Sequence, residues 1–145
     1  MAEQTDTLCR IELPAALQSL PGFIAEVTRH ARQAGFGEHK IGAMELALEE
    51  TIVNIVNYSC KDPHSLITVT CSLDRDKEFH ISIIDNGPPF NPLQKDVPDT
   101  DAGIDDRPIG GLGIFLVREL TDGVGYVRKD EKNILTITMK KENRD

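Results

Sequence analysis

The spacing of apolar residues changes along the chain from a helical repeat to a strand repeat. Between residues 17 and 59 the apolar positions recur every three or four residues, which predicts helices over 17–34 and about 38–59. From 67 to 83 apolar and polar residues alternate, which predicts two strands joined by a hairpin turn at 74–77. Because helices precede hairpins instead of alternating with single strands, a doubly wound parallel sheet is disfavoured.

The rest of the chain adds three predicted strands and a short third helix. Residues 8–13 alternate weakly and end at Pro14, as expected of an edge strand. A helix is predicted over 112–120, and strands over 124–128 and 134–139. We therefore expect an α+β protein, a two-layer α/β sandwich with a mainly antiparallel mixed sheet and helices on one face.

Size and charge exclude several classes of protein. The 145 residues suit one domain over 1–145, and the net charge of −8 opposes binding to nucleic acid or to an anionic membrane. No apolar run approaches the roughly 20 residues that a membrane span needs, and the start does not resemble a signal peptide. We expect a cytoplasmic protein whose cysteines, Cys9, Cys60 and Cys71, are reduced and mostly buried.

The helix predicted over 38–59 carries a line of polar side chains beside its apolar stripe. Glu50, Asn54 and Asn57 form this line among small and apolar neighbours. A carboxylate and two amides are costly in such surroundings unless they are hydrogen-bonded or coordinated. From this helix alone, a second interpretation stays open, in which Glu50 and Asn54 simply face solvent.

A second polar segment follows the strand that ends near residue 85. Asp85 shares the parity of Ile81 and Ile83, so its carboxylate is expected to leave the strand on the core side. Gly87 would let a flat ligand approach the backbone closely. An ordinary turn at the end of a strand uses the same residue types, so this segment alone does not identify a site.

A third segment is the run Gly110, Gly111, Leu112, Gly113 at the start of the predicted third helix. Backbone amides exposed by glycines, together with a helix N-terminus, form a natural anion site. The run lacks the Gly-Lys-Ser/Thr of a P-loop and does not follow a strand. Residues 86–110, which lead into it, are rich in proline and aspartate and predict a long functional or disordered loop.

Together, the Glu-x-x-x-Asn helix, the Asp-x-Gly-x-Pro-Phe turn and the Gly-Gly-Leu-Gly helix start resemble, in this order, the N, G1 and G2 boxes of the GHKL ATPases. The resemblance covers nearly the whole chain. The compact size and the run from Arg107 to Ile114 resemble the anti-sigma factor, serine-protein kinase branch of bacterial partner-switching systems. The resemblance implies a Bergerat ATP-binding fold and a single histidine-kinase-like ATPase domain over 1–145.

The resemblance also implies roles for the first two segments. Glu50 would be the catalytic base toward an attacking serine or threonine hydroxyl, and Asn54 would be the protein ligand of Mg²⁺. Asp85 would accept a hydrogen bond from the adenine amino group, and Gly87 would give the base room. Many relatives carry a histidine shortly after the box asparagine, whereas this chain has Asn57, Tyr58 and Ser59 there.

The remaining roles implied by the resemblance concern the phosphates and a late strand. Gly111 and Gly113 would cradle the phosphates, and about 91–109 would form an ATP lid. Arg107 is the candidate contact to the terminal phosphate. Thr136 would support the adenine aspartate through a water molecule.

The resemblance implies a Mg-ATP-dependent serine/threonine protein kinase that acts as an anti-sigma factor and phosphorylates an anti-sigma-factor antagonist. A sigma factor would be the second partner, and a homodimer built on 17–34 and 8–13 is expected. The alternative is an ATP-gated anti-sigma or adaptor binding module without kinase activity. Glu50 favours the enzyme, because a module that only binds needs no base.

Overall fold

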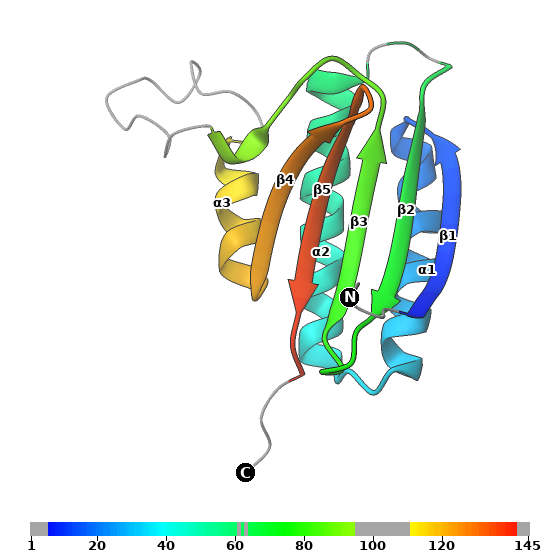
Figure 1. Cartoon of the computed structure of the whole chain (residues 1–145), viewed down its shortest axis with the longest axis vertical. Coiled ribbons are helices and arrows are strands. Elements are labelled where there is room, and N and C mark those ends of the chain that lie inside the picture. The colour runs from blue at the N-terminus through cyan, green and yellow to red at the C-terminus, as the bar shows by residue number, and fades with distance from the viewer. Residues whose placement is uncertain (1–5, 61, 63, 95–110, 142–145) are drawn as a thin grey trace.

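The alternating residues form a sheet, and the segments with helical repeats cover one of its faces (Figure 1). The structure is a computed structural model that describes residues 6–60, 62, 64–94 and 111–141. The strands are β1 (Asp6–Pro14), β2 (Leu66–Leu73), β3 (Phe79–Asp85), β4 (Gly123–Lys129) and β5 (Lys132–Met139). The main helices are α1 (Leu20–Gln33), α2 (Glu38–Asn54) and α3 (Gly111–Leu120).

The strand order in the sheet is β1-β2-β3-β5-β4, and the pairings are antiparallel. The predicted two-layer α+β architecture is confirmed, with β1 at one edge as expected. Among the described strands the sheet is antiparallel throughout, although a mixed sheet was expected. β3 and β4 are joined through α3 and run parallel to each other, but β5 lies between them, so each hydrogen-bonded pair stays antiparallel.

The core lies between the sheet and the helices. The inward residues of the central strands are fully or almost fully buried, and they are Ile67, Val69, Cys71, Ile81, Ile83, Leu135 and Ile137. The helices contribute Phe23, Val27, Ala31, Ile41, Met44, Leu48 and Ile52. Burying one such large apolar side chain contributes about 1.5–3 kcal/mol, so the two-layer packing follows directly from the apolar periodicities.

The connection from α1 to α2 shows why the helices stop where they do. Gly35 has a φ of 98°, in the left-handed region that glycine adopts without a steric penalty. The amide of Phe36 donates to the carbonyl of Ala31 at 3.1 Å, and the amide of Gly35 donates to that of Arg32 at 3.0 Å. These bonds satisfy the last carbonyls of α1, and α2 begins three residues after Gly35, at Glu38.

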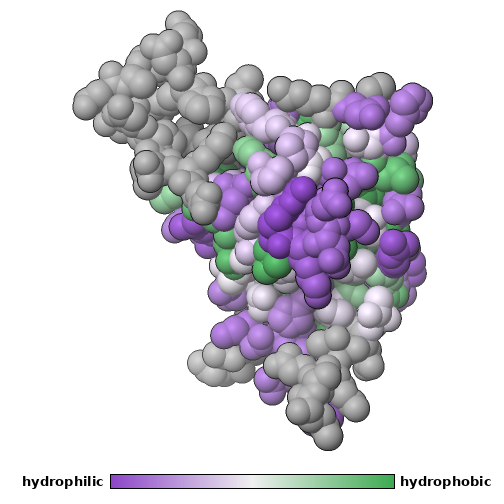
Figure 2. All heavy atoms as spheres, turned by 45° about the horizontal axis from the view of Figure 1, so that its top comes forward, coloured by the Kyte–Doolittle hydropathy of each residue, from purple (hydrophilic) through white to green (hydrophobic). Residues whose placement is uncertain are grey.

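The surface in Figure 2 shows hydrophobic side chains interspersed among hydrophilic ones. Among the residues that the structure describes, the exposed large apolar side chains are Leu17, Leu46, Leu66, Phe115, Leu116 and Val127. In the part of the chain that the structure describes, none of the helices has the length and apolarity to cross a membrane.

Candidate functional site

A small pocket lies where the C-terminal end of α2 meets the end of β3 and the start of β5. Apolar and aromatic side chains form most of its wall, with a few polar groups among them. The lining residues are Thr51, Asn54, Ile55, Ile83, Asp85, Phe90, Pro92, Ile114, Tyr126, Asn133 and Leu135. Small-molecule sites are commonly built in this way, with apolar walls and a small number of placed polar groups.

Asp85 is the charged residue of this pocket and is only 3% exposed. Its Oδ1 accepts from the Ser59 hydroxyl at 2.8 Å and from the Gly87 amide at 2.9 Å. The Asn133 amide also donates to Oδ1, at 3.0 Å, and the Cys60 thiol lies 3.6 Å from it. A buried carboxylate needs such donors, and the ones described here are uncharged and converge on one oxygen. The predicted inward direction of Asp85 is confirmed.

Asn133 is the residue that sequence reasoning missed. It is 3% exposed and lies directly opposite Asp85 in the pairing of β3 with β5. Its amide also donates to the Pro88 carbonyl at 2.9 Å, and its Oδ1 accepts from the Phe90 amide at 3.1 Å. The Tyr126 hydroxyl donates to the same Oδ1. Asn133 therefore joins β3, β4 and the turn after β3 around the pocket.

A local signal for Asn133 was present in the sequence. Asn133 shares its parity with Leu135, Ile137 and Met139, all of which are buried. A polar residue on the core side of a strand has to find partners, and that is a reason to suspect a site.

Thr136, by contrast, is not brought to the pocket. It pairs with Ser82, and the two hydroxyl oxygens lie 3.4 Å apart on the sheet face away from the helices. Since neighbouring side chains on a strand point to opposite faces, the sheet itself separates Thr136 from Asp85. The prediction that Thr136 supports the aspartate is therefore wrong, and Asn133 contacts Asp85 directly instead.

The end of α2 explains the glycine at position 87. After Asn54 the chain continues in a π-helical turn, Ile55–Ser59, and the Cys60 amide donates to the Ile55 carbonyl at 2.8 Å. Such turns are rare and occur often at functional sites. A Cβ on Gly87 would lie 2.4 Å from Ser59 Oγ and 2.7 Å from its carbonyl oxygen. Gly87 is thus required by the close approach of Ser59, which differs from the predicted reason of room for a base.

Two residues near the end of α2, Thr51 and Asn54, also line the pocket. Asn54 is 4% exposed and supplies an amide, while Thr51 lies one turn before it. Thr51 Oγ1 is buried and has no hydrogen-bond partner among the described residues. An unsatisfied buried hydroxyl costs about 1–3 kcal/mol, so this group marks a place where a ligand or water would be stabilised.

Glu50 lies near the pocket but does not line it. It is half-buried on α2, four residues before Asn54, and so on the same side of the helix. Its neighbour Glu49 is exposed. The structure therefore places the predicted base at the border of the pocket.

The predicted phosphate-binding segment is described only in part. Gly111 and Gly113 lie in the first turn of α3, and Ile114, which follows them, lines the pocket. Arg118 donates to the Leu93 carbonyl at 2.8 Å, which fastens α3 to the segment after β3. Arg107 and most of the predicted lid, from 95 onward, lie outside the described residues.

Comparison with known proteins finds a family model that matches most of the chain and relatives that cover about two thirds of it or more. Residues 13–139 match the model of the family described as "Histidine kinase-like ATPase domain". The chain is 32% identical over 96 residues to the serine/threonine-protein kinase BtrW of Bordetella bronchiseptica, covering 66% of this chain and 67% of the relative. It is 29% identical over 109 residues to the serine-protein kinase RsbW of Bacillus cereus, covering 72% and 68%.

Solved structures show the same fold. A structure of RsbU and RsbW domains from Mycobacterium tuberculosis superposes with a TM-score of 0.62 over 91% of this chain, at 15% identity, and this chain spans 32% of that one. A histidine kinase domain from Erythrobacter litoralis gives a TM-score of 0.52 over 96% of this chain and 69% of its own, at 14% identity. The predicted resemblance is confirmed, and the chain belongs to the histidine kinase-like ATPase domain family.

Proposed function

We propose that this chain is an ATP-dependent serine/threonine protein kinase whose pocket at Asp85 binds adenine. The observation that carries the proposal is the buried Asp85 carboxylate, which neutral donors hold through Oδ1 in an otherwise apolar pocket. In this proposal Oδ2 accepts from the exocyclic amino group of adenine. The walls of Ile55, Ile83 and Leu135 suit the faces of a flat base.

The polar groups of α2 fit the phosphate side of the same nucleotide. Asn54 offers an amide oxygen, a hard donor of the kind that Mg²⁺ binds together with waters and phosphate oxygens. Bound there, Mg²⁺ would neutralise charge on the phosphates. The amides at the start of α3, at Gly111 and Gly113, would hold the phosphate oxygens. Arg107 stays the proposed contact to the terminal phosphate, within a lid over about 91–109 of a single domain, 1–145.

Glu50 is the proposed base. As the substrate hydroxyl oxygen forms its bond to the terminal phosphorus and the bond to the bridging oxygen breaks, Glu50 takes the hydroxyl proton. Its half-buried position, one turn before Asn54, leaves it accessible from outside the pocket. A protein substrate needs that access, since its serine has to reach the terminal phosphate.

The partners are proposed from the relatives that are named serine-protein kinases. In this proposal the substrate is an anti-sigma-factor antagonist, the second partner is a sigma factor, and the chain forms a homodimer in the cytoplasm. The second candidate is an ATP-gated binding module that holds these partners without phosphorylating them.

Replacing Glu50 separates these two functions. In Glu50→Gln the side chain keeps its shape but cannot take a proton, so phosphate transfer is expected to fall by about 10²- to 10⁴-fold. ATP affinity is expected to change little, because the proposed contacts to the nucleotide come from other residues. Labelled ATP with candidate antagonist proteins measures the transfer, and equilibrium titration measures the affinity.

The matched control is Glu49→Gln, which changes the exposed neighbouring carboxylate on the same helix. This control should transfer phosphate at the wild-type rate. Absent transfer by the wild type to an antagonist that it binds in the presence of ATP would reject the kinase in favour of the binding module.

A further inference from the structure

Two cysteines lie opposite each other in the neighbouring strands β1 and β2, and neither of them lines the pocket described above. Cys9 of β1 pairs with Cys71 of β2, and their sulfur atoms lie 3.3 Å apart. Both thiols are free. Directly opposed residues in an antiparallel pair have Cα atoms about 4.5–5.5 Å apart, within the range that disulfides span. Closing the sulfur pair to a bond of about 2.05 Å therefore needs only a small movement.

The two thiols differ in how far they are exposed to solvent. Cys71 is fully buried, and this burial, followed by the neighbouring Cys9, raises the pKa of its thiol, so it reacts with a dissolved oxidant less readily than an exposed thiol does. Cys9 is half-buried on the edge strand. An oxidant from solution would therefore reach Cys9 first, with Cys71 directly behind it.

The backbone beside Cys9 is able to adjust. The regular pairing of β1 with β2 is interrupted between Thr7 and Cys9, so Cys9 ends the regular ladder that runs back from Pro14. An irregular position in an edge strand gives way more easily than the middle of a paired strand. The movement that a disulfide needs can thus be absorbed at Leu8 without disturbing β2.

We propose that Cys9 and Cys71 are a redox-sensitive modification site that forms a reversible intramolecular disulfide. With hydrogen peroxide as the oxidant, the Cys9 sulfur attacks a peroxide oxygen and becomes a sulfenic acid, releasing water. The Cys71 sulfur then attacks the Cys9 sulfur, the S–O bond breaks, and the hydroxide leaves with the Cys71 proton as a second water. Two thiols and one peroxide thus give one disulfide and two waters, and a dithiol reductant reverses the change.

The disulfide would fasten the edge strand to the sheet. It links residues 62 positions apart, so it removes much of the conformational freedom of the unfolded chain. We expect the melting temperature of the oxidised protein to be higher by on the order of 10 °C. Cys60 serves as an internal reference, since its described partner is the Asp85 carboxylate and not a thiol.

The experiment treats the full chain with hydrogen peroxide, denatures it, and labels the remaining thiols with a maleimide. One labelled thiol is expected in place of the original three, and mass spectrometry of a digest should find the peptides of Cys9 and Cys71 joined. Dithiothreitol should restore three thiols. Cys9→Ser should lose both the crosslink and the rise in melting temperature, whereas Cys60→Ser should keep the crosslink.

Three labelled thiols after oxidation would overturn the proposal. So would crosslinks between two copies of the chain, a linked peptide that contains Cys60, or a Cys9 oxidised to sulfinic acid beside a free Cys71. Thiol counting on the wild type needs no variant to fold, and it does not depend on whether the pocket binds ATP.

Discussion

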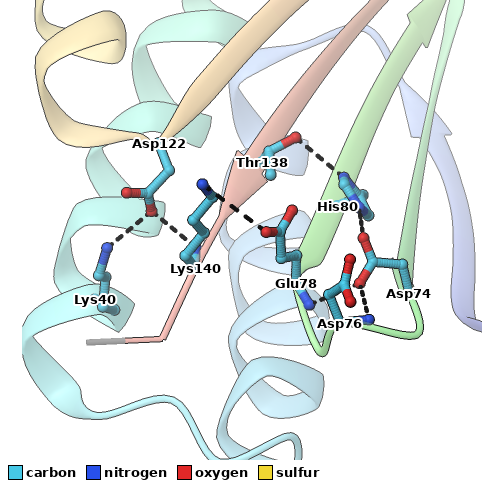
Figure 3. A network of polar contacts seen from close by, with 8 residues as sticks. All are labelled: Lys40, Asp74, Asp76, Glu78, His80, Asp122, Thr138 and Lys140. Atoms are coloured by element: carbon cyan, nitrogen blue, oxygen red, sulfur yellow. Dashed lines mark hydrogen bonds and ion pairs between the residues drawn. The ribbon is translucent and has the colours of Figure 1, made fainter. Parts of the chain in front are cut away.

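Asp85 and Asp74 lie at opposite ends of the β2–β3 hairpin, and they are held in different ways. Asp74 follows β2, and its Oδ1 accepts from the amides of Asp76 and Glu78 at 2.8 and 3.0 Å. Its Oδ2 lies 2.9 Å from His80 Nε2, as Figure 3 shows. The other ring nitrogen of His80 lies 3.0 Å from Thr138 Oγ1. Asp74 thus uses both oxygens within its own hairpin.

Asp85 differs in burial, in partners and in the use of its oxygens. It is more deeply buried than Asp74, its described donors are uncharged, and they converge on Oδ1. Asp74 has a partner that can carry a positive charge and is part of a surface network with the ion pairs Lys140–Glu78 and Lys40–Asp122. The comparison indicates that Asp74 stabilises the fold, while Asp85 keeps one oxygen without a described donor, which is the oxygen assigned to adenine in our proposal.

The different roles of Asp85 and Asp74 are tested most directly by replacing each carboxylate in turn with the neutral amide. Asp85→Asn should weaken ATP binding by about 10- to 100-fold, because a hydrogen bond to a charged group contributes about 1.5–3 kcal/mol. Asp74→Asn should leave ATP affinity within about twofold of the wild type. Isothermal titration of both variants measures this difference. Equal losses in the two variants would remove the distinction between a ligand-binding and a structural aspartate.

A second test concerns the buried hydroxyl of Thr51 in the pocket wall. Thr51→Val replaces the buried hydroxyl that has no described partner with a methyl group of similar size. The protein without nucleotide should become more stable by about 1 kcal/mol, while ATP affinity should fall. Urea unfolding and ATP titration measure the two effects. A loss of stability would mean that the hydroxyl has a partner in the free protein.

The pH dependence of stability tests the structural role of Asp74. The hydrogen bond from His80, followed by the amide of Glu78, holds the pKa of Asp74 below its ordinary value of 3.8. Because the folded pKa is lower than the unfolded one, the stabilisation is present above pH 3.8 and is lost as the pH falls through the folded pKa. The free energy of unfolding, measured with urea, should therefore be larger for the wild type than for Asp74→Asn at pH 7. The difference between the two proteins should become smaller as the pH is lowered below 3.8. A gap that stays constant down to pH 2 would contradict this role.

The helices, the strands and two pocket residues, Asn54 and Asp85, could be predicted because they depend on local sequence patterns. Helical and alternating periodicities gave the element types, and parity alone gave the inward direction of Asp85. The contacts of Asn133 depend instead on the register of β5 against β3, which brings together residues 48 positions apart. Thr136 was misplaced for a different reason, because its parity is opposite to that of the buried Leu135 and Ile137, and this local alternation already indicated the outer face of the sheet.

The end of α2 shows a different limit of sequence reasoning. A periodic pattern predicts that a helix continues to Ser59, but it does not distinguish an α-helical turn from a π-helical one. That difference decides which side chain faces Asp85, and here it directs the Ser59 hydroxyl to the carboxylate.

The place of β1 in the sheet has a consequence for the order of folding. β2 with β3 and β4 with β5 are hairpins that close over short turns, whereas β1 reaches β2 only after both α1 and α2 have been traversed. Closing that long loop costs more chain entropy, so we expect β1 to join the sheet last and to leave it first. In native-state hydrogen exchange the amides of β1 should therefore exchange sooner than those of β3. Equal protection of the two strands would mean that the sheet forms as one cooperative unit.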